Sequence, residues 1–592
     1  MLRLLAAFTI ATAVSISSFA QLAPPPPRVV PAPPKVDPQK VAERLAKQVT
    51  LSEQVLSEVP GLRLGENRAH VYAKVGVLLW KSDQKTAKEL FQRSVNDLLN
   101  VQMLAEADEK NRQNGNDLRT IQSIRPPILT VIGTLDAEFA LESLYRTRTG
   151  AIQRALAQAS EQPGSKIGDT YGNSGLVAQT ELTLEQRLIR MAAEQNPERA
   201  AKLLQESIKK GLSNETLSLL RKLYEKDSEL ADSLAAETLD KLLSTTFPAN
   251  PADQGPIGLS YSILNDSLRV RRPDARELTF AETGIRSLAN KVINYAMSAG
   301  QNMRFRGLDF PTLIKFAEKY SPAMVAALKK LEKANMPPGA NVPDSDTRKL
   351  MESSMTPAQM LAEAKKLPAE SRSPVYQNAA NRMSQTGEYN AALELLNSNF
   401  TGKALENAIN SLNWWYASHL MNQSKWAEAE RLIDEMPESN RRSALISLAT
   451  RAFAKDPNEN KTYALSVLQK VRGLLADKPS DQNELSQFIQ LTSAYAPIEP
   501  TEAFGTFEPV IPMLNELSDA SAVVQGFQNP YSIRSGEFVM ANNNSYGFYF
   551  DQNLIRSLAK ADFERAIKLI DTFTRREFRI SLKLQLAETG LN

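Results

Sequence analysis

The segments GEYNAALELL (387–396) and SKWAEAERLI (424–433) begin 37 positions apart and repeat one pattern. Each has an aromatic residue, Tyr389 or Trp426, followed by alanine three positions later and a large aliphatic residue seven positions later. This spacing places the three side chains on one face of an α-helix. Tyr463 stands 37 positions after Trp426. The pattern predicts an α-helical repeat array, in which these aromatic side chains hold neighbouring hairpins together rather than bind a ligand.

Amphipathic stretches with apolar residues at three- and four-residue spacing recur along most of the chain, and strand signals are scarce. Near the C-terminus the pattern returns as Phe563, Ala566 and Ile570. No such helix buries its apolar face alone, so neighbouring helices must stack. The expected fold is all-α, an α-solenoid of stacked antiparallel helical hairpins.

A short polar residue followed by proline is expected to begin several of these helices, because the polar side chain caps the open N-terminus and proline suits the first helical position. The six pairs are Asp37-Pro38, Asn196-Pro197, Ser321-Pro322, Thr356-Pro357, Ser373-Pro374 and Asp456-Pro457.

Ala379-Ala380, then Gly387-Glu388-Tyr389, Ala392 and Leu396, resemble a tetratricopeptide repeat. Partial copies lie at 413–436 and 561–570, and the resemblance covers mainly residues 373–470 and 561–570. The period is about 37 residues rather than the family's 34, Ser424 replaces the turn glycine, and the closing proline is out of step. The resemblance implies a curved array that binds a partner on its concave surface.

The N-terminus is expected to direct export. Arg3, an apolar stretch over 4–16 and Ser18-Phe19-Ala20 have the form of a signal peptide, residues 1–20, cleaved after Ala20. Retention as an N-terminal anchor is the alternative. Residues 21–38 form a proline-rich segment, expected to be an extended spacer or, less in keeping with its position, a ligand for an aromatic groove. The mature protein is expected in the periplasm or outside the cell, with no transmembrane span.

The remaining chain divides by composition into an N-terminal helical array (39–334), a linker rich in proline (335–348) and a C-terminal array (349–592). An aromatic, glycine-rich and asparagine-rich insertion at 526–550 is expected to form a long loop or a small β-hairpin. The candidate partner-binding residues are those of the insertion and one tryptophan outside the repeat pattern: Tyr531, Phe538, Tyr546, Phe548 and Trp415.

The residues that commonly carry chemistry are few. The chain has no cysteine, two histidines, His70 and His419, and no glycine-rich phosphate-binding motif, so no catalytic, cofactor-binding or metal-ligating residue is predicted. Glu66, four positions before His70, is expected to form a surface ion pair or helix-face contact with it, and His419 is expected to be packed on its helix or at its edge.

The favoured function is a non-enzymatic scaffold for protein–protein interactions in the cell envelope, whose protein or peptide partner and oligomeric state are unknown. The 70 basic and 67 acidic residues nearly balance, so no nucleic-acid partner is expected. The enzyme alternative is a cell-wall enzyme that cleaves peptidoglycan or another glycan, built on a helical superhelix. A glycosidase needs only two suitably placed carboxylates, and the sequence alone does not locate such a pair.

Overall fold

A computed structural model describes residues 38–107, 116–161, 174–247, 255–269, 277–299, 310–335, 345–528, 532–540 and 552–589. The chain divides into two units, Met1–Leu45 and Ala46–Asn592. Only the first residues of helix α1 are described in the first unit, and the fold below is that of the second. The predicted signal peptide and proline-rich segment lie outside the described residues except for Pro38, the first residue of α1.

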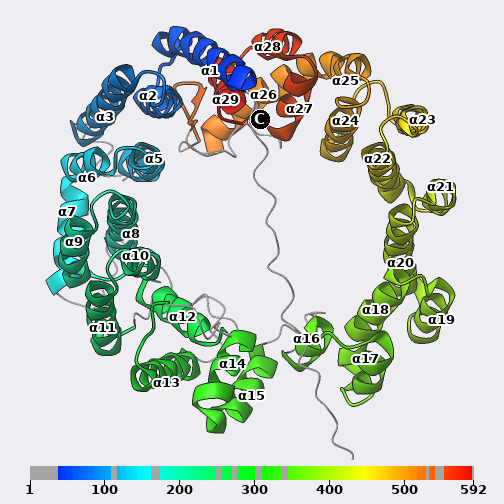
Figure 1. The fold of residues 1–592 in the computed structure, drawn as a ribbon, viewed down its shortest axis with the longest axis horizontal. Coiled ribbons are helices and arrows are strands. Elements are labelled where there is room, and N and C mark those ends of the chain that lie inside the picture. The colour runs from blue at the N-terminus through cyan, green and yellow to red at the C-terminus, as the bar shows by residue number, and fades with distance from the viewer. Residues whose placement is uncertain are drawn as a thin grey trace, which may run out of the picture. The chain divides into compact units, whose positions relative to one another are not determined.

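The described part of the chain is almost entirely helical, which confirms the all-α fold class (Figure 1). The α-helices of the N-terminal half are α1 (Pro38–Glu58), α2 (Gly65–Leu79), α3 (Gln84–Ala107), α5 (Asn116–Gly133), α6 (Ala137–Arg146), α7 (Gly150–Glu161), α8 (Ser174–Ala192), α9 (Pro197–Lys210), α10 (Glu215–Tyr224), α11 (Ser228–Ser244), α12 (Gly255–Ser267), α13 (Glu282–Ala299), α14 (Phe310–Tyr320) and α15 (Val325–Asn335).

The C-terminal half contains α16 (Ser345–Glu352), α17 (Pro357–Ala364), α18 (Ala369–Gln385), α19 (Tyr389–Asn399), α20 (Gly402–Asn422), α21 (Trp426–Asp434), α22 (Glu438–Lys455), α23 (Lys461–Gly473), α24 (Gln482–Tyr495), α25 (Pro500–Phe507), α26 (Ile511–Gln528), α27 (Gln552–Ala561), α28 (Phe563–Asp571) and α29 (Arg576–Thr589). Short 3₁₀ helices occupy Val59–Gly61, Pro322–Met324 and Glu508–Val510, and two strands, β1 (Ile533–Arg534) and β2 (Glu537–Phe538), pair in antiparallel register.

Consecutive helices pack as hairpins, as the repeat pattern predicts (Figure 1). The pairs α18–α19, α20–α21, α22–α23 and α24–α25 are in contact, and their first helices also contact one another in the order α18, α20, α22, α24. The helices α8, α10 and α12 do the same in the N-terminal half. Each hairpin therefore buries its apolar face against its neighbours, which is how a repeat array builds a continuous core.

The two turns 37 residues apart adopt the same backbone conformation. Gly387 has φ +94° and Ser424 has φ +60°. In both turns an N–H donates to the carbonyl five residues earlier, from Glu388 to Met383 at 2.8 Å and from Lys425 to Leu420 at 3.0 Å. This hydrogen bond is typical of a helix end at which the residue just before the donor has a left-handed backbone. Ser424 thus replaces glycine in the sequence and keeps its conformation.

Two of the six expected helix starts hold in full and two are wrong. Asn196 caps α9, and Thr356 forms a capping box with Gln359 at the start of α17. Helix α18 instead begins at Ala369, so Pro374 lies inside it and leaves one carbonyl of the preceding turn without its usual partner. Asp456 follows the end of α22, and its carboxylate accepts from the N–H groups of Asn458 and Glu459, which forms a turn. Pro322 begins a 3₁₀ helix, and Asp37 lies outside the described residues.

The predicted linker 335–348 contains no described non-helical residue. Residues 336–344 lie outside the described part, Asn335 ends α15, and α16 begins at Ser345. Both predicted arrays belong to the unit Ala46–Asn592, and the boundary between them stays a prediction.

The helices at the two ends of this unit are in contact. Helix α2 packs against α29, and one hydrophobic core contains Leu51 and Val75 together with Phe578 and Leu582. No helix in the part of the chain that the structure describes is both long and apolar enough to cross a membrane.

Candidate interaction surfaces

The exposed face of α26 is the most apolar surface among the described helices. Leu514, Ser518 and Ala522 point into the protein and are buried. The opposite side carries Leu517, Val523, Val524 and Phe527, which are 41, 63, 52 and 89% exposed. Leu517, Val524 and Phe527 lie seven and three residues apart, so they form one stripe along the helix. Contiguous exposed apolar residues of this kind mark surfaces that bind a partner.

A two-residue turn after α26 builds the β-hairpin that the sequence suggested. Ser535 and Gly536 have φ +49° and +73°, the conformation of a type I′ turn, whose twist suits an antiparallel pair. Ile533 pairs with Phe538, and both pack against Ala522 on the buried side of α26. The described residues of the hairpin therefore pack against α26 on the side opposite to its apolar face.

The hairpin also contacts the N-terminal part of the unit Ala46–Asn592. The Glu537 carboxylate, which is 6% exposed, accepts from the side chain of Asn67 and from the backbone N–H of Arg63, both at 2.7 Å. The Asn67 amide donates to the carbonyl of Phe538 at 2.7 Å and accepts from the N–H of Met540 at 2.8 Å. The Asn67 side chain therefore forms hydrogen bonds with the hairpin backbone as a neighbouring strand would, although Asn67 lies on α2, 470 positions before Glu537.

Of the five predicted candidate residues, the structure describes two, Phe538 and Trp415. Phe538 is buried, with the Arg575 guanidinium 5.0 Å from its ring centroid. Trp415 is 37% exposed on α20. Tyr531, Tyr546 and Phe548 lie outside the described residues. A partner-binding role for these five residues stays a prediction, and the structure brings none of the described ones onto the α26 face.

The aromatic residues of the repeat pattern sit between hairpins, as expected. Tyr389 stacks on Tyr416 of α20 with ring centroids 4.6 Å apart and donates to Asn413 at 2.7 Å. The Tyr463 hydroxyl lies 3.3 Å from the carbonyl of Trp426 in the preceding hairpin. Their hydroxyl groups are used for contacts within the array, which argues against a ligand track.

The two histidines hold structural positions. Burial, with a smaller effect from the charge of Lys74, lowers the pKa of His70 to about 4, so its imidazole is neutral at pH 7. The expected pairing with Glu66 is wrong, because Glu66 is buried and forms an ion pair with Arg534 of the hairpin. His419 is packed at the turn before α19, with Nδ1 2.7 Å from the Gln385 carbonyl and Nε2 2.8 Å from Gln423.

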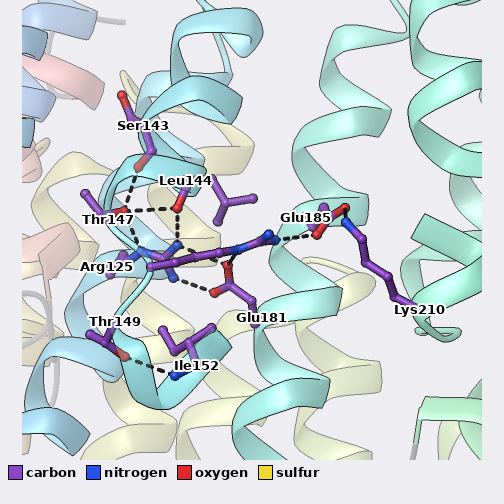
Figure 2. Close-up of polar contacts among 10 residues, drawn as sticks. Arg125, Ser143, Leu144, Thr147, Thr149, Ile152, Glu181, Glu185 and Lys210 are labelled. Carbon is purple, nitrogen blue, oxygen red and sulfur yellow. Dashed lines mark hydrogen bonds and ion pairs between the residues drawn. The ribbon is translucent and has the colours of Figure 1, made fainter. Parts of the chain in front are cut away.

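A buried network of charged side chains connects α5, α8, α9 and the loop after α6 (Figure 2). Arg125 reaches both carboxylate oxygens of Glu181, and Arg148 donates to the same carboxylate at 2.7 Å. Arg148 also contacts Glu185, which accepts from Lys210 at 2.8 Å. Glu181 and Glu185 are only 3 and 1% exposed.

These contacts decide how the buried acids behave. Burial by itself raises the pKa of Glu181, but the hydrogen bonds and charges of Arg125 and Arg148 outweigh burial, and the pKa is lowered. A general acid in a glycosidase needs a raised pKa. Glu181 is therefore an ionised partner that holds helices together. Among the described residues, no group of three or more His, Asp or Glu side chains is placed to hold a metal ion.

The basic cluster near the C-terminus is also taken up by internal contacts. Arg575 forms ion pairs with Asp519 and Glu577, and Arg579 with Glu58. Arg579 lines an open cleft of about 490 Å³ together with Ser57, Glu58, Gly61, Asp571 and Arg576. The cleft is lined by acidic and basic side chains together, so it does not form a continuous basic surface.

Comparisons with known proteins give little beyond this. No protein-family model matches the sequence, and no curated protein matches it. Among solved structures, the chain is similar to one described as "Circular tandem repeat protein with novel repeat topology and enhanced subunit contact surfaces". The identity is 12%, the TM-score is 0.18, and the match covers 92% of this chain and 97% of the other. We therefore assign the chain as a helical repeat protein from the packing of its own hairpins.

Some of these features had a local sequence signal and others had none. The stripe of α26 follows helical spacing and was detectable as an apolar face, but sequence spacing does not say which face a neighbour covers. The partner of Glu537 lies 470 positions away, so no local pattern points to it.

Proposed function

We propose that this protein is an exported, non-enzymatic scaffold of tetratricopeptide-like hairpins, which binds a protein or peptide partner in the cell envelope through the exposed face of α26. The observation that carries the proposal is the exposure of four large apolar side chains on one helix, with Phe527 at 89%. Fully burying an exposed side chain of this size contributes about 1.5–3 kcal/mol. Phe527 comes nearest to that case and the other three are partly covered already, so a partner that covers the face gains a part of this energy at each residue.

The surroundings of the face support a fixed docking surface. The buried side of α26 packs on the β-hairpin through Ala522, and the Asp519 carboxylate lies 2.9 Å from the Arg575 side chain. A helix held in this way loses little conformational entropy on binding, which favours affinity. The leader-like residues Arg3 and 18–20 support export to the periplasm or the cell exterior.

The test uses the chain recovered after export as bait for proteins of the envelope fraction. The variant carries Val524→Ser and Phe527→Ser, and we expect a captured partner to bind at least about tenfold more weakly, since two apolar contacts are lost. The intact mass of the recovered chain checks export, because cleavage after Ala20 leaves Gln21 first.

A matched control carries Met103→Ser and Leu104→Ser on α3. These side chains are 66 and 73% exposed, so the control removes similar apolar surface elsewhere. Equal capture by the wild-type protein and the α26 variant contradicts this site, and a chain that keeps residues 1–20 and stays inside the cell contradicts export.

A further inference from the structure

The exposed side of α20 carries a second surface, which differs from α26 in chemistry. Trp415 is the most exposed residue between Ser411 and Met421, with 37% of its surface accessible. Ser411, Ser418 and Asn422 lie four residues before, three after and seven after Trp415, so all share its helix face. One indole is thus surrounded by hydroxyl and amide groups.

Arg451 on α22 faces the same place. Its Nη1 donates to Ser418 Oγ at 3.0 Å and to Asn422 Oδ1 at 3.3 Å. Both partners are neutral, and Arg451 forms no salt bridge with any described residue. Arg451 is exposed, and both printed hydrogen bonds use Nη1, so its Nε and Nη2 donors remain available to pair with an anion. On the other side Ser411 lies 3.4 Å from Asn381 of α18, which extends the polar surface across three helices.

The side chains around Trp415 and Arg451 favour some classes of ligand over others. A protein partner with an apolar contact surface gains little here, because Trp415 is the one large exposed apolar side chain among the described residues of α18, α20 and α22. Nucleic acid binding needs several cations to neutralise phosphates. Among the described residues here, Arg451 and the exposed Lys455, four residues later on α22, supply two. A sugar ring has an apolar face of C–H groups and a rim of hydroxyls, which match an indole bordered by Ser and Asn side chains.

We propose that Trp415, Arg451 and the Ser and Asn side chains around them form a binding surface for an acidic glycan, a chain of sugar rings bearing carboxylates. Trp415 stacks on a ring, Arg451 pairs with a carboxylate, and Ser411, Ser418 and Asn422 exchange hydrogen bonds with hydroxyls. The surface is independent of the α26 face and binds a different class of ligand.

The test measures binding of three probes to the full mature chain by titration calorimetry. The probes are an oligogalacturonate, the same oligosaccharide with its carboxylates methyl-esterified, and a poly-glutamate peptide. We expect the acidic oligosaccharide to bind best. Trp415→Ala weakens its binding about tenfold or more, Trp415→Tyr keeps part of it, and Arg451→Gln removes the preference for acid over ester.

Two controls remove similar groups from other faces: Met355→Ala, from a side chain 39% exposed, and Arg199→Gln, from one 60% exposed. Both are expected to bind as the wild type does. Circular dichroism melts of all variants check folding, and Arg451→Gln and Trp415→Tyr give the answer even if Trp415→Ala is unstable. The proposal is wrong if the acidic oligosaccharide does not bind, if Trp415→Ala binds it equally well, or if poly-glutamate binds as tightly.

Discussion

Ser424 holds a backbone conformation that glycine holds one repeat earlier. A side chain at φ +60° brings Cβ close to the following carbonyl, at a cost of about 1–2 kcal/mol, whereas glycine avoids the clash. We expect Ser424→Gly to stabilise the hairpin α20–α21 by about 0.5–1 kcal/mol, after the greater flexibility of glycine in the unfolded chain is subtracted. Hydrogen exchange of the backbone amides in α20 and α21 measures this gain in stability.

The reciprocal change at Gly387 is the control. A Cβ there would lie 3.0 Å from His419 Nε2, and φ is +94°, so Gly387→Ser is expected to destabilise its own hairpin. Faster exchange in Ser424→Gly than in the wild type would show that the serine is not strained.

At the scale of the helices, the buried pair of Arg125 and Glu181 connects α5 with α8. Glu181→Gln leaves Arg125 with an uncompensated charge at 2% exposure, and we expect a local loss of about 3–5 kcal/mol. The pKa of Glu181 is lowered in the folded protein, so its contribution is present above the unfolded value of 4.5 and is lost as the pH falls through the folded value.

Hydrogen exchange in α5 and α8 at pH 7 reports the loss for Glu181→Gln. A series that continues below pH 4.5 should show that the wild type loses protection while the variant changes less. Glu138→Gln removes an acid from an exposed pair with Arg199 and should change exchange little. Equal effects of the two substitutions would contradict the importance of the buried pair.

Helices were predictable where the information is local. Tyr389, Ala392 and Leu396 specify a helix face within eight residues, and Thr356 with Gln359 specifies a helix start within four. The helix start predicted at Ser373-Pro374 was wrong because α18 begins earlier, directly after Pro368. The sequence alone does not show which of the two prolines marks the start of the helix. The candidate sites were predictable only in part. Phe538 is aromatic and lies in an insertion, but it is buried against Ala522 and Ile533, with Arg575 over its ring, and no local spacing in the sequence indicates these contacts.

At the scale of the whole described unit, the contacts between its ends separate this protein from a simple linear array. In a linear array each repeat contacts only its neighbours, so a change at one end is not felt at the other. Here Asn67 of α2 accepts and donates three hydrogen bonds to the hairpin at 533–540, and Lys74 pairs with Glu588 at 2.8 Å. The two ends should therefore lose their structure together.

A double-mutant cycle on Asn67 and Glu537 tests this coupling. Asn67→Ala leaves the buried Glu537 carboxylate without a side-chain donor, and we expect each single substitution to speed hydrogen exchange in both α2 and α29. The interaction energy of a buried pair in one network is about 0.5–3 kcal/mol, so the double variant should be less destabilised than the sum of the singles. If Asn67→Ala instead affects α2 alone and the two substitutions add, the ends fold independently and their contact contributes little to stability.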